Sequence, residues 1–296
     1  MTSQYTLKTE LPLLTLLALL WGSSYLFLKV AVSEIPPLTL IALRVTGAAG
    51  FLLVVLRLRG ETLPRDWRTR RMLLRQALFN SICAWTILAW GQQFVDASLA
   101  SVLNSTSPIF VFAFTALVTH HEPLGGRKLA GVIIGFLGVV LIVGVAALRG
   151  LGTQVAGQLA CLTGAALYAG AAIYGTRFSH LPAVVTAAGT MTWASVVLVP
   201  LALVLDRPWT LNPSVKAIGA TATLSVFCTA IALLIYFRLV RTIGSVGVAS
   251  QGYLRAGVGV VLGLLLLGET ISPSVAVGLV AAITGVVLIC SAPRST

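Results

Sequence analysis

The chain has 296 residues, of which 57% are hydrophobic and 9% are charged, and its formal net charge is +12. A soluble domain carries roughly 25% charged residues, so this composition excludes an ordinary water-soluble domain. In a soluble protein the positive charge would suggest a nucleic-acid partner. Here the basic residues lie in short gaps between apolar runs, which argues against nucleic acid and indicates signals of membrane topology.

Apolar runs of membrane-spanning length recur along the chain. A helix needs about 20 mostly apolar residues to cross a bilayer. Ten runs meet this requirement, at approximately residues 11–31, 37–56, 73–94, 98–119, 127–147, 155–176, 184–205, 215–237, 246–267 and 274–292. The first is predicted to be a retained helix, because no small-residue cleavage motif follows it at a suitable distance.

Basic residues in the connections are concentrated on one side of the predicted membrane. That side takes Lys8, the seven arginines between Arg57 and Arg75, Arg127, Lys128, Arg177, Arg238, Arg241 and Arg294. The other side takes only Lys29, Arg149, Arg207 and Lys216. Because Lys and Arg are retained in cytoplasmic loops, both ends of the chain are predicted to be cytoplasmic.

The two halves of the chain resemble each other. An ungapped shift of 147 residues places Trp21 on Tyr168, Ser98 on Ser245, Glu122 on Glu269, Gly131 on Gly278 and Gly138 on Gly285. The pattern predicts two five-helix repeats, residues 1–147 and 148–296. Since five is odd, the second repeat enters the membrane from the opposite side. Inverted repeats are typical of secondary transporters, whose site lies near the midplane between the halves.

Short motifs recur in a fixed order along these spans. They are Leu20-Trp21-Gly22-Ser23-Ser24, Pro108-Ile-Phe-Val-Phe, Glu122-Pro-Leu, Gly131-Val-Ile-Ile-Gly135-Phe-Leu-Gly138 and, in the second half, Gly268-Glu269, Gly278 and Gly285-Val-Val-Leu. The chain resembles the ten-helix EamA-type exporters of the drug/metabolite transporter superfamily. The resemblance implies a monomeric all-α basket around a central cavity in the bacterial inner membrane. It also implies export or exchange of small metabolites, often amino acids.

The ninth predicted span contains Arg255, about nine residues from its start. The family pattern has a proline near this place, so Arg255 is expected to serve this protein's own substrate. A buried guanidinium is costly and stays charged. Three explanations remain open: it binds a substrate carboxylate or phosphate in a wet cavity, it ties neighbouring helices together, or the span boundary is misplaced.

Polar and aromatic residues mark the predicted cavity. We expect substrate-binding roles for Arg255, Asn104, Gln251, Trp21, Asn80, Trp85, Tyr168 and Tyr253. Asn104 and Gln251 are repeat mates, as are Trp21 and Tyr168, so each pair can meet at the axis. We expect structural or gating roles for Arg44, Pro108, Gly257 and Gly259, since glycine permits close helix packing and rocking.

Acidic residues fall at predicted helix ends or in connections, and none lies at mid-membrane. This argues against ion coupling through an intramembrane carboxylate and favours an anionic group on the substrate. The four cysteines lie in apolar runs and are interpreted as small core residues, without disulfides. His120-His121-Glu122 lacks the HExxH spacing, so no metal site, cofactor or catalytic centre is predicted.

The sequence therefore predicts a secondary transporter rather than an enzyme, with a small-molecule substrate and the lipid bilayer as its partners. The expected substrate is a zwitterionic amino acid with an aromatic or aliphatic side chain. Its carboxylate would meet Arg255 and its ammonium Asn104, Gln251 or backbone carbonyls. The alternatives are another anionic metabolite, such as a nucleotide-sugar or organic acid, or a drug. A membrane-embedded enzyme and a receptor are more distant alternatives.

Overall fold

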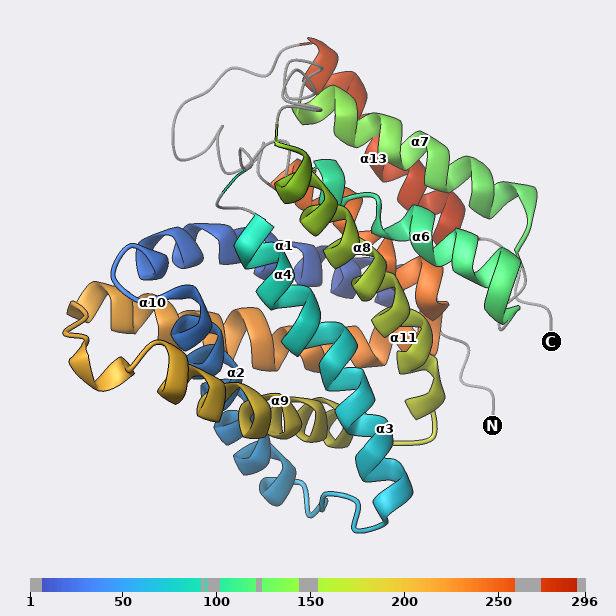
Figure 1. The fold of residues 1–296 in the computed structure, drawn as a ribbon. Helices are drawn as coiled ribbons and strands as arrows, with labels where there is room; N and C mark the ends of the chain where they lie inside the picture. Colours follow the sequence, from blue (N-terminus) through green and yellow to red (C-terminus); the bar gives the residue numbers. More distant parts are fainter. Residues whose placement is uncertain are drawn as a thin grey trace.

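The structure is a computed structural model and describes residues 7–91, 94, 102–120, 124–143, 154–258 and 273–291. Within these ranges all regular secondary structure is helical, which confirms the predicted all-α class (Figure 1). Eight residues discussed individually above lie outside the described residues: Ser98, His121, Glu122, Arg149, Gly259, Gly268, Glu269 and Arg294.

The described helices follow the predicted apolar runs. In the first half they are α1 (Leu7–Val32), α2 (Pro37–Leu58), α3 (Trp67–Ala77), η1 (Leu78–Cys83), α4 (Ala84–Gly91), α6 (Ser107–Phe114), η2 (Thr115–Thr119) and α7 (Gly126–Val143). In the second half they are α8 (Val155–Gly175), η4 (Thr176–Phe178), α9 (Ala183–Leu205), η5 (Pro208–Thr210), α10 (Val215–Ser225), η6 (Val226–Ile231), α11 (Ala232–Ala249) and α13 (Pro273–Cys290).

Six helical stretches of the described part are long and apolar enough to cross a membrane. They are Pro37–Leu58, Val102–Thr119, Val155–Phe178, Ala183–Leu205, Val215–Ala249 and Pro273–Cys290. Many large apolar side chains point outward from these helices, for example Val54, Leu159 and Val280. A soluble monomer rarely exposes so much contiguous apolar surface, so the outer surface suits lipid rather than water.

Helix α11 contains the junction between two predicted spans. The sequence predicts a connection at residues 238–245, and α11, which extends from Ala232 to Ala249, changes direction within it, at Gly244. Gly244 has φ 78° and ψ −179°, a conformation that a residue with a side chain rarely adopts. The junction at Gly244 lies within the predicted connection, and a single glycine takes the place of the expected longer loop.

Two of the predicted spans are interrupted within their first halves. The span predicted at 98–119 turns at Ser105 and Thr106, and α6 restarts at Ser107 with Pro108 in its first turn. Proline suits this position because the first turn of a helix leaves its backbone N–H groups without intrahelical acceptors. A second turn at Ser250 separates α11 from a helical segment at residues 251–258.

Helices α7 and α13 pack side by side through four glycines (Figure 1). A Cβ atom built on Gly138 would lie 2.7 Å from the carbonyl oxygen of Gly278, and one on Gly131 would lie 2.7 Å from that of Gly285. Helix α2 packs against α9 in a second extensive contact. In both pairs the helices stand 147 residues apart in the chain, so the contacts join the regions predicted as repeat mates.

Candidate functional site

A cavity lies among the helices and contains about 940 Å³ of empty space, part of it open to solvent. It is lined by Trp21, Ser24, Leu28, Ile41, Arg44, Trp85, Leu88, Asn104, Ser107, Tyr168, Ala172, Tyr236, Val248, Ala249, Gln251 and Arg255. These residues come from α1, α2, α4, α6, α8, α11 and the flanking segments at residues 102–106 and 251–258. The cavity therefore gathers side chains from both halves of the chain.

Arg255 lies in the cavity wall on the helical segment 251–258 and is half-buried. Among the described residues its guanidinium has no hydrogen bond or ion pair. The segment is held close to α1, because a Cβ atom on Gly22 would lie 3.1 Å from Val258. A guanidinium that faces an open cavity in this way presents donor groups that match a carboxylate or a phosphate.

Arg44 also lines the cavity, although the sequence indicated a mainly structural role. Its Nε donates to Thr229 Oγ1 at 2.6 Å, and its Nη2 donates to the carbonyl oxygen of Cys228 at 3.2 Å. Its Cζ lies 4.3 Å from the centroid of the Trp85 ring. Thr229 and Cys228 belong to the π-helical turn η6, where altered spacing changes which carbonyls remain available. Arg44 thus joins α2 to η6 and adds a second positive charge to the wall.

No carboxylate is among the described residues that line the cavity, whereas two guanidinium groups are. Charges at the surface of a protein cavity attract more strongly than in bulk water, because the surrounding protein has a lower dielectric constant. The electrostatics of this wall therefore favour a ligand with an anionic group.

The two predicted amides both line the cavity, next to the helix interruptions. Asn104 precedes the turn at Ser105, and Gln251 follows the turn at Ser250. Ser105 Oγ donates to the carbonyl oxygen of Gly252 at 3.5 Å, which joins the two interrupted regions directly. The Oε1 atom of Gln251 is buried and accepts no hydrogen bond from the described residues. A buried acceptor of this kind is unfavourable until a donor reaches it.

Aromatic rings form the remaining wall. Trp21, Trp85 and Tyr168 line the cavity as the sequence predicted. Tyr236 joins them, with its ring centroid 5.5 Å from that of Trp21. Sequence reasoning missed Tyr236, because nothing in an apolar run shows which face of its helix points inward.

Several predicted residues lie elsewhere. Tyr253 is fully buried away from the cavity lining, and its hydroxyl donates to the carbonyl oxygen of Val132 in α7 at 3.0 Å. Asn80 is buried in η1 and donates to Ser81 Oγ at 3.1 Å. Gly257 faces Leu279 of α13, whose Cδ1 would lie 2.7 Å from an added Cβ. These positions are packing contacts in the described structure.

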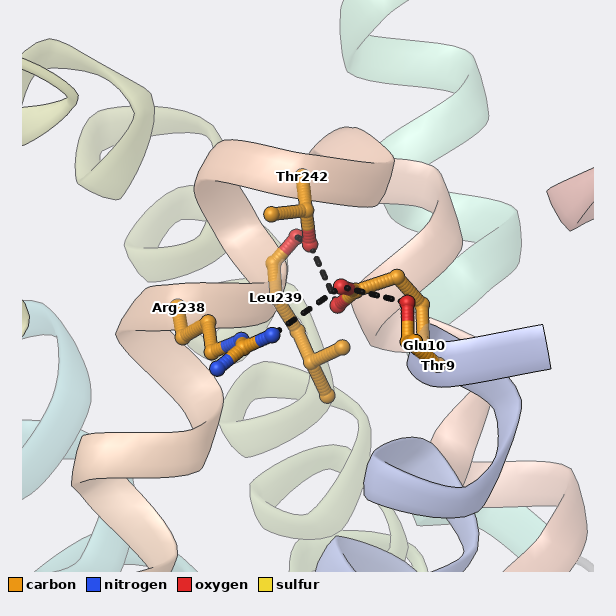
Figure 2. Close-up of polar contacts among 5 residues, drawn as sticks. All are labelled: Thr9, Glu10, Arg238, Leu239 and Thr242. Carbon is orange, nitrogen blue, oxygen red and sulfur yellow. Dashed lines mark hydrogen bonds and ion pairs between the residues drawn. The ribbon is translucent and has the colours of Figure 1, made fainter. Parts of the chain in front are cut away.

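The end of the bundle where α1 begins is closed by contacts between α1 and α11, and Figure 2 shows those that Glu10 makes with Arg238 and Thr242. We call it the basic end, because most connection arginines lie there. The carboxylate of Glu10, which is 2% exposed, accepts a hydrogen bond from Thr242 Oγ1 at 2.8 Å. Arg238 Nη2 lies 3.5 Å from the same carboxylate. Leu14 and Leu17, one and two turns further along α1, are fully buried. The contact between α1 and α11 therefore seals this side.

At the opposite end two carboxylates, those of Glu34 and Asp206, also join separate parts of the chain by hydrogen bonds. Glu34 accepts hydrogen bonds from the backbone N–H of Ser214 at 2.6 Å and from its hydroxyl at 2.8 Å. These bonds lower the pKa of Glu34, so the tie is complete at neutral pH and weakens only as the pH falls through that lowered pKa. Asp206 accepts from the backbone N–H and hydroxyl of Thr39, both at 2.8 Å, and so caps the start of α2.

Comparisons with known proteins identify the family of this chain, two similar transporters and a shared fold. The EamA-like transporter family matches residues 9–144 and, separately, residues 155–291. The inner membrane transporter YedA of Escherichia coli K12, described as uncharacterized, is 30% identical over 266 residues, which are 86% of this chain and 82% of YedA. An uncharacterized transporter of Archaeoglobus fulgidus is 29% identical over 95% of this chain and 96% of its own. A solved structure with 16% identity superposes with a TM-score of 0.79 over 95% of this chain and 97% of its own, which shows a shared fold.

Proposed function

Since this chain belongs to the EamA-like transporter family and is a multi-pass inner-membrane transporter, we propose that it exports or exchanges zwitterionic amino acids by alternating access. The observation that carries this proposal is Arg255, whose guanidinium faces the cavity without a hydrogen bond or ion pair among the described residues. The α-carboxylate binds there. The ammonium binds at the Gln251 acceptor on the same wall, with Asn104 nearby.

The aromatic wall selects the side chain. Trp21, Trp85, Tyr168 and Tyr236 offer ring faces that pack against an aromatic or aliphatic group and attract a nearby ammonium. Arg44 favours a second possibility. Its position on the same wall would suit an organic acid with two anionic groups, which is the alternative substrate class.

The architecture proposed for this activity has ten spanning helices in two inverted repeats, residues 1–147 and 148–296, with both termini in the cytoplasm. Three observations support it: the family matches the chain twice, α7 and α13 meet through reciprocal glycine contacts, and π-helical turns occur in both the third and the eighth predicted span. The cavity between the repeats is where inverted-repeat transporters bind their substrates.

Proteoliposome exchange tests the function. The purified protein is reconstituted with an unlabelled compound inside, and uptake of the same labelled compound is followed without a proton or sodium gradient. The panel contains aromatic, aliphatic and acidic amino acids, a dicarboxylate, a nucleotide-sugar and a cationic drug. We expect exchange of aromatic or aliphatic amino acids. Exchange of the dicarboxylate alone would favour the alternative, and exchange of the drug alone would contradict both.

Alternating access requires the seal at the basic end to open. Thr242→Val removes the hydroxyl that donates to Glu10 but keeps the shape of the side chain. Because a buried carboxylate that loses a hydrogen bond costs about 1–3 kcal/mol, the open form should become roughly tenfold more populated. The measurement is labelling of a cysteine placed at Leu17 by an aqueous maleimide, in a background without the four native cysteines. We expect the labelling rate to rise about tenfold.

The matched control is Ser214→Ala, which removes a hydroxyl from Glu34 at the opposite end. It should not increase labelling at position 17. Equal labelling of wild type and Thr242→Val would show that the Glu10 contact does not hold the basic end closed.

A further inference from the structure

Helix α3 carries a row of arginines on the face that points away from the protein. Arg68, Arg71 and Arg75 follow one another at i, i+3 and i+7, so they share one side of the helix. All three are exposed, and none has a hydrogen bond or ion pair among the described residues. Leu73 is buried on the opposite side against Gly189 of α9. We call these three residues the α3 arginine face.

The nearby carboxylates do not neutralise this face. Asp66 accepts a hydrogen bond from the backbone N–H of Thr69 at 2.7 Å and caps the start of α3. Hydrogen bonding with the side chain of Thr69 and then with its backbone N–H lowers the pKa of Asp66, so the capping carboxylate stays ionised at neutral pH. Arg70 points away from the arginine face and donates to the carbonyl oxygen of Pro64.

Apolar surface begins directly beyond the arginines on the same side. Leu78 and Phe79, one turn after Arg75, are 38% and 37% exposed. Phe79 packs against Tyr174 of α8, with ring centroids 6.1 Å apart. Arg177 belongs to η4, which directly follows α8, and its Cζ lies 4.9 Å from the centroid of the same tyrosine ring. The α3 arginine face and the exposed apolar side chains of Leu78 and Phe79 therefore adjoin where α3 packs against α8.

We propose that the α3 arginine face, together with Arg177, binds the phosphate of an anionic phospholipid whose acyl chain lies over Leu78 and Phe79. Guanidinium groups match phosphate oxygens in a bidentate geometry. Clusters of basic residues at the cytoplasmic membrane surface attract anionic headgroups. A soluble anion would have no use for the adjoining apolar patch. Trp67, which is 63% exposed beside the arginines, fits the aromatic belt at the headgroup level.

Lipid binding by the full-length protein tests this proposal without reference to transport. Delipidated protein is titrated with phosphatidylglycerol in phosphatidylcholine and detergent mixed micelles, and bound lipid is counted by native mass spectrometry. We expect saturable phosphatidylglycerol binding and no comparable phosphatidylcholine binding. The triple variant Arg68→Gln, Arg71→Gln, Arg75→Gln should bind phosphatidylglycerol at least about tenfold more weakly, since each basic residue near the surface contributes substantially.

The matched control is the triple variant Arg57→Gln, Arg59→Gln, Arg65→Gln. It removes the same charge from exposed arginines at the same end of the protein but leaves the α3 arginine face intact. It should bind like wild type. Equal weakening in both triple variants would show diffuse electrostatic attraction and overturn the site, as would no weakening in either. If the α3 triple variant does not fold, Arg71→Gln and Arg75→Gln are measured singly, each against Arg59→Gln, with roughly fivefold weakening expected.

Discussion

Replacing Arg255 with alanine is expected to reduce amino-acid exchange about 100-fold. Two charge-assisted hydrogen bonds to a carboxylate contribute about 3 kcal/mol, which corresponds to roughly a hundredfold in affinity. The loss should fall on substrate binding, because no hydrogen bond or ion pair of this guanidinium to another described residue would be broken. The measurement is the initial rate of exchange in proteoliposomes over a range of substrate concentrations.

Two further variants distinguish a role of Arg255 in substrate recognition from a role in helix packing. Arg255→Lys keeps the charge but loses the planar fork, so it should retain part of the exchange activity. Arg241→Ala removes an exposed arginine that donates only a long hydrogen bond, 3.4 Å, to the carbonyl oxygen of Leu181 outside the cavity. It should exchange like wild type. If Arg255→Ala remains folded and keeps wild-type rates, Arg255 has no part in substrate binding.

Replacing Gly138 with alanine is expected to destabilise the protein by about 3 kcal/mol, near the upper end for overpacked cores. The added Cβ would lie 2.5 Å from the backbone nitrogen of Ala282 and 2.7 Å from the carbonyl oxygen of Gly278. These are backbone atoms, which cannot rotate away, so α7 and α13 must separate. Thermal unfolding in detergent should show a midpoint lower by roughly 10 °C.

Gly50→Ala is the matched control, because Gly50 also lies within a helix but has no atom within 4 Å of an added Cβ. Its unfolding midpoint should stay the same or rise slightly, since alanine favours helix more than glycine does. Equal midpoints for the two variants would mean that the glycine contact between α7 and α13 is not a tight one.

Much of the cavity could be predicted because helical spacing is readable from sequence. Gln251 and Arg255 are four residues apart and share a helix face, and both line the cavity. The same rule shows why Tyr253 does not join them. It stands two residues from Arg255, which is more than half a turn around the helix. The expectation that all three face the substrate neglected this rotation.

Other positions could not be read from the sequence. Asn80 is buried within the π-helical turn Leu78–Cys83, and only Trp85, which follows that turn, reaches the cavity. No sequence pattern predicts such a π-helical turn. The sequence indicates a structural role for Arg44 but does not show that its side chain also lines the cavity. Its neighbours, Thr229 and Cys228, are remote in the chain and come together with it only in the fold.

The proposed contact between Arg255 and a substrate carboxylate is tested most directly by changing both partners. Exchange of L-phenylalanine and of L-phenylalanine amide, which lacks the carboxylate, is measured for wild type and Arg255→Ala. We expect wild type to exchange the acid far faster than the amide, and the variant to lose this discrimination. If wild type exchanges the two compounds equally, or if Arg255→Ala discriminates as well as wild type, the carboxylate does not bind at Arg255.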